Sequence, residues 1–117
     1  MLLADSITIL TPDDAGCIVV SGSHGGRSAG EYAVRYPLAL CCLNDAGVGK
    51  DHAGIAALAM LDAQGIAGVA YSHVSARIGE AADGWENGVV SHVNNAARAL
   101  GFCVSTRLRE AIERAFA

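Results

Sequence analysis

The chain has 117 residues, of which 52% are hydrophobic and 17% charged, a composition and length that suit one globular domain and exclude a disordered chain. No apolar run approaches the roughly 20 residues of a membrane span, and the N-terminus lacks the basic start of a secretory signal, so we expect one cytoplasmic domain over residues 1–117. Eight Lys and Arg against 12 Asp and Glu, with no basic block, argue against nucleic-acid and membrane partners.

The first half of the chain alternates short apolar runs with segments of helical periodicity, which is typical of an α/β fold. Residues 6–10 and 17–21 are apolar runs on either side of a turn-rich connector, and we interpret them as an antiparallel pair of strands. A helix over residues 28–36 should end before Pro37, because proline disfavours helical geometry in the residue before it. Another strand is expected over residues 38–43.

The second half continues the alternation. In chain order we expect a helix over residues 51–64, a strand over 66–71, a loop with helical turns over 76–88, a helix over 89–100, a strand over 102–105 and a terminal helix that includes Leu108 and Ile112. Connections between parallel strands are right-handed. The pattern therefore predicts a three-layer, mostly parallel sheet of about five strands, with helices on both faces and the antiparallel pair at the N-terminus.

Polar residues follow three of the expected strands, in the segments 21–27, 44–52 and 72–77. Because the carboxyl ends of parallel strands meet at one edge of a sheet, we expect the three segments to lie side by side. An open α/β sheet binds its ligands at this edge, so together they predict a single cleft that holds the functional site.

The first segment surrounds Ser23 and His24 with three glycines, which allow backbone amides to approach an anion or an oxyanion. A tight turn with a capping serine is the structural alternative. The spacing does not match the G-x-G-x-x-G pattern of dinucleotide-binding proteins. From this segment we select Ser23 and His24 as catalytic candidates, and Ser21, Gly25 and Gly26 as substrate-binding candidates.

The second segment is partly similar to a nucleotide-binding loop, because Gly49 and Lys50 precede a helix. Asn44 stands where that loop requires its first glycine and Asp51 where it requires a hydroxyl, so we exclude an ATPase. The lysine can instead bind a carboxylate or phosphate or act as a base, and a solvent-exposed lysine paired with Asp51 is the alternative. The catalytic candidates are Asp45 and Lys50, and the binding candidates are Asn44, Gly47 and Gly49.

The third segment places His73 just after an apolar strand, where it can act as a general acid or base. Ser75 and Arg77 follow as substrate-binding candidates, since arginine can contact a planar anion through two hydrogen bonds. A structural histidine at a strand end is the alternative. A further Ser-His pair begins at Ser91, which we interpret as the N-cap of the helix expected there.

Ser23, His73 and Asp45 can be assembled into a hydrolase triad, but the G-x-S-x-G signature is absent. The four histidines and four cysteines show no metal-binding spacing, so we predict no metal. We also predict no cofactor, because neither a nicotinamide nor a flavin signature is present.

The segments 21–26 and 44–51, which read SGSHGG and NDAGVGKD, are similar to segments of small uncharacterised bacterial α/β proteins. This resemblance implies a single α/β domain and carries no particular reaction.

The combined pattern predicts an enzyme that acts on a small anionic metabolite, with hydrolase- or lyase-type acid/base chemistry in the loops after the strands. A metabolite-binding or regulatory module without turnover is the alternative, and a structural subunit is a third. The short length and low charge fraction favour a homo-oligomer.

Overall fold

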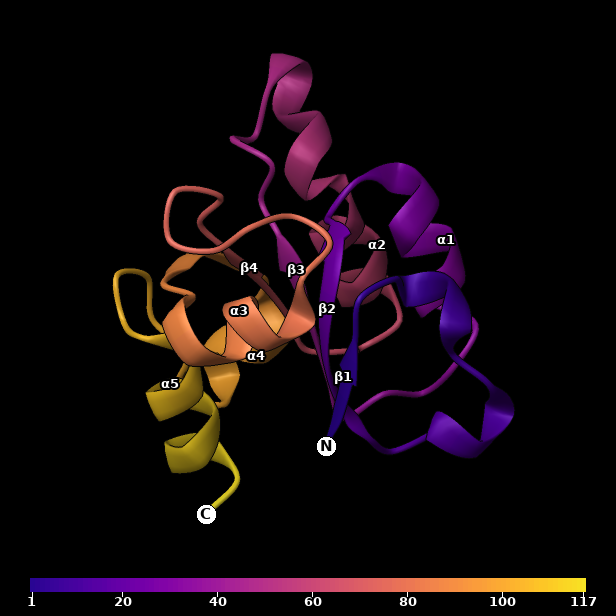
Figure 1. Cartoon of the computed structure of the whole chain (residues 1–117). Coiled ribbons are helices and arrows are strands. Elements are labelled where there is room, and N and C mark those ends of the chain that lie inside the picture. Colours follow the sequence, from indigo (N-terminus) through magenta and orange to yellow (C-terminus); the bar gives the residue numbers. More distant parts are fainter.

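The computed structural model describes all 117 residues and contains one five-stranded sheet with helices on both faces (Figure 1). The strands are β1 (Leu2–Ala4), β2 (Ile18–His24), β3 (Leu40–Asn44), β4 (Gly68–Tyr71) and β5 (Val90–Val93). They lie in the order β1-β2-β3-β4-β5, with β4 and β5 antiparallel and the other neighbours parallel. This confirms the predicted fold class.

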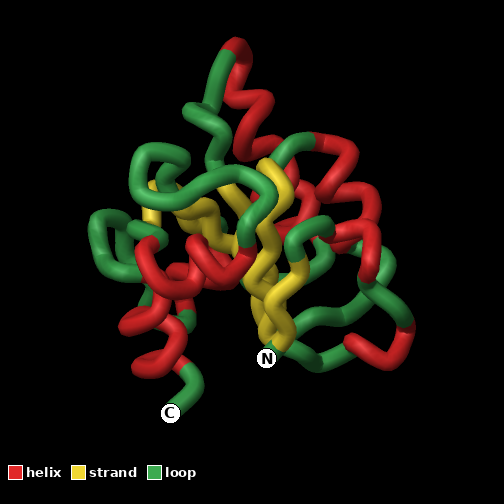
Figure 2. Tube along the Cα trace, in the orientation of Figure 1, coloured by secondary structure: helices red, strands yellow, loops and turns green.

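The helices fall into two groups on opposite sides of the strands, as the tube in Figure 2 also shows. The α-helices are α1 (Arg27–Ala33), α2 (Ala56–Ala63), α3 (Ala81–Asn87), α4 (Asn95–Ala99) and α5 (Leu108–Ala115), and the 3-10 helices are η1 (Ile7–Ile9), η2 (Pro12–Asp14) and η3 (Lys50–Ile55). None of them has the length and apolar character needed to cross a membrane.

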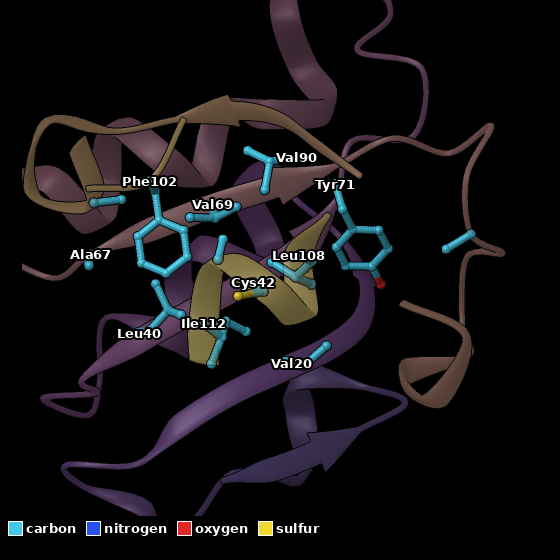
Figure 3. Packing of buried hydrophobic residues seen from close by; sticks show 13 residues of the cluster. Val20, Leu40, Cys42, Ala67, Val69, Tyr71, Val90, Phe102, Leu108 and Ile112 are labelled. Carbon is cyan, nitrogen blue, oxygen red and sulfur yellow. The ribbon is translucent and has the colours of Figure 1, made fainter. Parts of the chain in front are cut away.

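Alternating side chains of the central strands divide the core into two clusters. Cys41 belongs to the cluster that includes residues of α1 and α2, whereas Cys42 belongs to the cluster that includes residues of α5. Figure 3 shows Cys42 among Leu40, Phe102 and Ile112. Both cysteines are fully buried, and burial raises the pKa of the Cys41 thiol to about 12, so this thiol stays protonated at neutral pH.

The chain does begin with a pair of neighbouring strands, but the predicted antiparallel pairing is wrong. The partner of β2 is β1, which precedes the predicted strand 6–10 and pairs in parallel. Residues 7–9 form η1 instead, held by hydrogen bonds from the Thr8 amide to Ser6 Oγ and from the Ile7 amide to Ser23 Oγ. Side chains of serine that bond nearby amides compete in this way with a strand ladder.

The predicted helix over residues 89–100 is also wrong at its first half, where the chain forms β5. Three valines between residues 89 and 93 favour a strand, and Asn94 ends it. Asn94 Oδ1 accepts hydrogen bonds from the amides of Ala97 and Gly68, so it caps α4 and ties it to β4. Ser91 therefore lies in a strand and caps no helix, and residues 102–105 form no strand.

Strands β3 and β4 are parallel neighbours whose following connections turn to opposite faces of the sheet. The chain after β3 leads to α2, which packs with the first cluster, and the chain after β4 leads to α3, whose Trp85 packs with the second. In open α/β sheets, ligands bind outside the carboxyl ends of the strands. This topology directs attention to the residues that follow β3 and β4.

Candidate functional site

A buried carboxylate and an exposed imidazole meet at the ends of β3 and β4. His73 Nδ1 lies 3.2 Å from Asp45 Oδ1, and the same oxygen accepts hydrogen bonds from the amides of His73 at 3.0 Å and Gly47 at 2.8 Å. The Asp45 side chain is 7% exposed and that of His73 is 49% exposed. The carboxylate is thus fixed by the fold, while the ring that it orients is open to solvent.

The surroundings of Asp45 favour its charged form. Burial acts to raise the pKa of Asp45, but hydrogen bonds from the Gly47 and His73 amides and from the His73 ring outweigh it and lower the pKa below its ordinary value of 3.8. The ionised carboxylate can only accept hydrogen bonds, so the contact assigns the Nδ1 proton to His73. In the neutral ring this leaves the Nε2 lone pair free to accept a proton.

The loop after Asp45 has an unusual backbone that shapes the site. Ala46 and Val48 have φ of 52° and 67°, and Asp51 and His52 have φ of 56° and 58°. Left-handed geometry is a marked outlier for a β-branched residue such as valine, and strain of this kind clusters at functional sites. Hydrogen bonds from Val48 N to Asp45 O and from Gly54 N to Val48 O hold the loop in this form.

Gly47 and the segment that follows it frame the imidazole. A Cβ atom on Gly47 would lie 3.3 Å from His73 Cε1, so the absence of a side chain lets the ring sit against the loop. Residues 46–55, which we call the arm, include η3 and project beyond the carboxyl ends of the strands as the magenta segment of Figure 1.

An open groove of about 570 Å³ lies between the arm and α2 on one side and β5 and α4 on the other. Its lining residues are Asp51, His52, Ile55, Ala56, Leu58, Ala59, Asp62, Ser91, His92, Val93, Asn94, Asn95, Arg98 and Val104. Ser91 lines the groove and is one of the polar groups that lower the pKa of Asp45, and its hydroxyl donates a hydrogen bond to the Ala70 carbonyl at 3.3 Å. Asp45 and His73 themselves do not line the groove.

The serines of the first predicted segment are bonded within the fold. Ser21 is buried, and its Oγ accepts from the Ser23 amide while its carbonyl accepts from the Tyr71 hydroxyl at 2.6 Å. Ser23 Oγ accepts from the Ile7 amide at 2.9 Å. The Gly25 amide donates to the Asn44 carbonyl. These contacts favour the structural alternative for these residues, and their functional roles stay predictions.

His24 is the register partner of Asn44 and is exposed, but it makes no hydrogen bond with Asp45 or His73. Its ring lies over Gly26, where a Cβ atom would come within 2.8 Å of His24 Nε2. The Asn44 side chain is buried and bonded to the Ala76 carbonyl and the Ala46 amide. Of these residues, only His24 remains free to meet a ligand.

The remaining predicted residues lie apart from the Asp45–His73 pair or serve the fold. Lys50 is exposed on the arm and forms no ion pair. The neighbouring Gly49 is also exposed, and its backbone has φ of 74°. Arg77 is 80% exposed beside Glu80 at 3.9 Å. Ser75 Oγ donates to the Ser72 carbonyl and accepts from the Val89 amide.

Sequence reasoning missed the groove and its polar residues on β5 and α4, above all His92, Asn95 and Arg98. The sequence feature that could have revealed it is the Ser91-His92 pair among valines, because a strand over these residues would have placed the pair beside β4. No three His, Cys, Asp or Glu side chains lie close enough together to hold a metal ion.

Comparisons with protein-family models, with curated proteins and with solved structures found no match to this chain.

Proposed function

We propose that this protein is an enzyme that acts on a small anionic metabolite by hydrolase- or lyase-type acid/base chemistry, with the Asp45–His73 pair as its proton-transfer group. The observation that carries this proposal is the contact between a buried, ionised carboxylate and the Nδ1 atom of a half-exposed imidazole at the carboxyl ends of two parallel strands. A carboxylate in this position orients the ring and stabilises the imidazolium that forms when Nε2 takes up a proton.

The surroundings of the Asp45–His73 pair favour a mechanism in which His73 takes a proton from water or from the substrate, and not from a serine nucleophile. The ring of His73 has one hydrogen-bond partner within the chain, Asp45, and no Ser or Cys side chain bonds to it. In hydrolysis, Nε2 takes a proton from a water molecule as its oxygen attacks the substrate, and the imidazolium returns that proton to the leaving group. In elimination, Nε2 takes a proton from carbon and returns it to the departing group.

The groove also suits the alternative, a module that binds a metabolite without turnover, because its volume fits a small ligand. The two functions differ in what happens when His73 is replaced. Binding in the groove would survive this change, whereas turnover that depends on proton transfer at Nε2 would not.

The proposal is tested with a panel of small carboxylates that carry an ester, an amide or a leaving group on the carbon β to an acidic C–H, with product formation followed by proton NMR. We expect turnover of one class, and a loss of about 10²- to 10⁴-fold in kcat with His73→Gln. Asp45→Asn, which removes the charge that stabilises the imidazolium, should also lower kcat, and Asp13→Asn, which removes a solvent-exposed carboxylate on η2, is its control and should leave the rate unchanged. A fully active, folded His73→Gln variant would overturn the assignment, and binding without turnover across the panel would favour the alternative.

A further inference from the structure

Arg98 brings a positive charge without an ion pair to the groove. Arg77 and Arg109 lie within 4 Å of glutamates, whereas Arg98 has no carboxylate at that distance. Its single hydrogen bond within the chain runs from Nη1 to Asn95 Oδ1 at 2.9 Å. A guanidinium has five N–H donors, so four of them are left for a ligand or for water.

Asn95 holds this guanidinium in place through an amide bridge. Asn95 Nδ2 donates to Asp62 Oδ2 at 3.0 Å, while its Oδ1 accepts from Arg98. The amide thus stands between the carboxylate and the guanidinium, which form no direct ion pair. Arg98 is thereby fixed on the groove wall instead of being neutralised by Asp62.

The acidic residues of the groove compete little with an anionic ligand for the Arg98 guanidinium. Both Asp62 oxygens already accept hydrogen bonds, one from Asn95 and the other from the Ala96 amide at 3.0 Å. Asp51 lies on the exposed arm at the opposite wall. Their two negative charges nevertheless favour a ligand with one negative charge over a phosphate dianion, because like charges in one site repel.

The other groove residues indicate what accompanies the charge. His92 Nδ1 lies 3.1 Å from Ser91 Oγ, which leaves its Nε2 for a ligand. The remaining wall is largely aliphatic, formed by Ile55, Leu58, Ala59, Val93 and Val104. An apolar body against this wall gains free energy as its surface leaves water.

We infer that the groove binds the carboxylate of a small molecule with an apolar body, that Arg98 pairs with the carboxylate, and that the apolar body lies along the aliphatic wall. This inference rests on the proposed function, since it names the class of its substrate. Because the groove is lined by Ser91 of β5, the strand paired with β4, and the end of β4 leads to His73, a ligand held here lies near the Asp45–His73 pair. The guanidinium can form two parallel hydrogen bonds with a carboxylate, which gives the contact its direction.

The test uses hexanoate, hexanol and hexylamine, three probes with the same body and different head groups, in NMR titrations of the isotope-labelled protein. We expect hexanoate to shift the amide signals of β5, α2 and α4 and to bind at least about tenfold more tightly than the other two. Arg98→Gln should weaken hexanoate binding about tenfold and leave hexanol binding unchanged. Arg114→Gln, an exposed arginine on α5, is the matched control and should bind like the wild type.

Equal binding of the three probes, tighter binding of hexylamine, or hexanoate shifts outside the groove would overturn the inference. The spectrum of each variant reports whether it is folded, and Arg98→Lys, which keeps the charge without the planar fork, should retain part of the affinity. If hexanoate does not bind in the groove, the inference fails, but the turnover test with His73→Gln still decides the proposed function independently. Conversely, groove binding with a fully active His73→Gln variant would remove the proposed catalytic role and leave the binding site standing.

Discussion

Two glycine-rich loops follow the neighbouring parallel strands β2 and β3, and the chain uses their residues in different ways. At the end of β2 and just after it, glycines allow backbones to come close: a Cβ atom on Gly22, within the strand, would lie 2.5 Å from the Gly79 carbonyl carbon, and one on Gly25, after the strand, would lie 2.8 Å from the Gly54 oxygen. After β3 the glycines serve two purposes: Gly54 lets the backbone approach the Asp45 and Val48 carbonyls, whereas Gly49 has no atom within 4 Å of such a Cβ, and its φ of 74° is what requires glycine.

The polar groups of the two loops also differ: those near the end of β2 stabilise the fold, and those after β3 hold a side chain at the surface. Around the end of β2, Ser21 Oγ and Ser23 Oγ accept hydrogen bonds from backbone amides and thereby tie the loop to itself and to η1. After β3, Asp45 gathers the Gly47 amide and His73 and holds an imidazole at the surface. Glycine content alone therefore does not identify a site. The arrangement that does is a buried charge whose hydrogen bonds fix a reactive group in contact with solvent.

The largest effect expected from this comparison is a loss of stability in Gly22→Ala. The new methyl group would meet the backbone of Gly79 and Glu80, at 2.5 and 2.6 Å, and backbone atoms cannot turn aside as a flexible side chain can. We expect the free energy of unfolding to fall by about 3 kcal/mol, measured by urea denaturation. An alanine tolerated within about 0.5 kcal/mol would show that the close approach is unimportant and would break the comparison.

The sheet and its central strands were predictable because their signals are local and strong. Apolar runs near residues 40 and 68 must form buried strands wherever the chain places them, and Gly65 follows the end of α2 as expected. The convergence of Asp45 and His73 was predictable for the same reason, since parallel neighbouring strands bring their carboxyl ends together.

The rest depended on contacts that a sequence does not display. Whether Ser23 serves a ligand or η1 depends on where Ile7 lies, and that was hidden when residues 6–10 were interpreted as a strand. The groove was missed because valines at helical spacing around residue 91 also fit a strand, and pairing with β4 decides between the two. The left-handed arm cannot be foreseen from Val48 or His52, which normally avoid that backbone region.

A smaller effect than that of Gly22→Ala is expected from Gly49→Ala, which sharpens the comparison by separating backbone strain from steric contact. The residue has φ of 74° and ψ of −168°, a region that is essentially restricted to glycine, yet its surroundings are open. We expect a loss of about 2 kcal/mol in the free energy of unfolding, again by urea denaturation. If the loss equals or exceeds that of Gly22→Ala, the distinction between steric contact at Gly22 and backbone strain at Gly49 does not hold.

The smallest effect is expected from Asp45→Asn, and its pH dependence is more informative than its size. The amide oxygen still accepts hydrogen bonds from Gly47 and His73, so we expect the free energy of unfolding to fall by only about 1 kcal/mol at pH 7.

Because folding lowers the pKa of Asp45 below 3.8, its ionised form stabilises the folded state. This contribution is fully present above the ordinary pKa and is lost as the pH falls through the lowered pKa. The stability difference between the wild type and Asp45→Asn should therefore shrink as the pH falls below about 4. Urea denaturation across this range measures the difference, with Asp13→Asn as the control. A difference that grows as the pH falls from about 5 to about 3 would mean that the carboxyl group is stabilised in its protonated form, and His73 would then lack the charged partner on which its orientation depends.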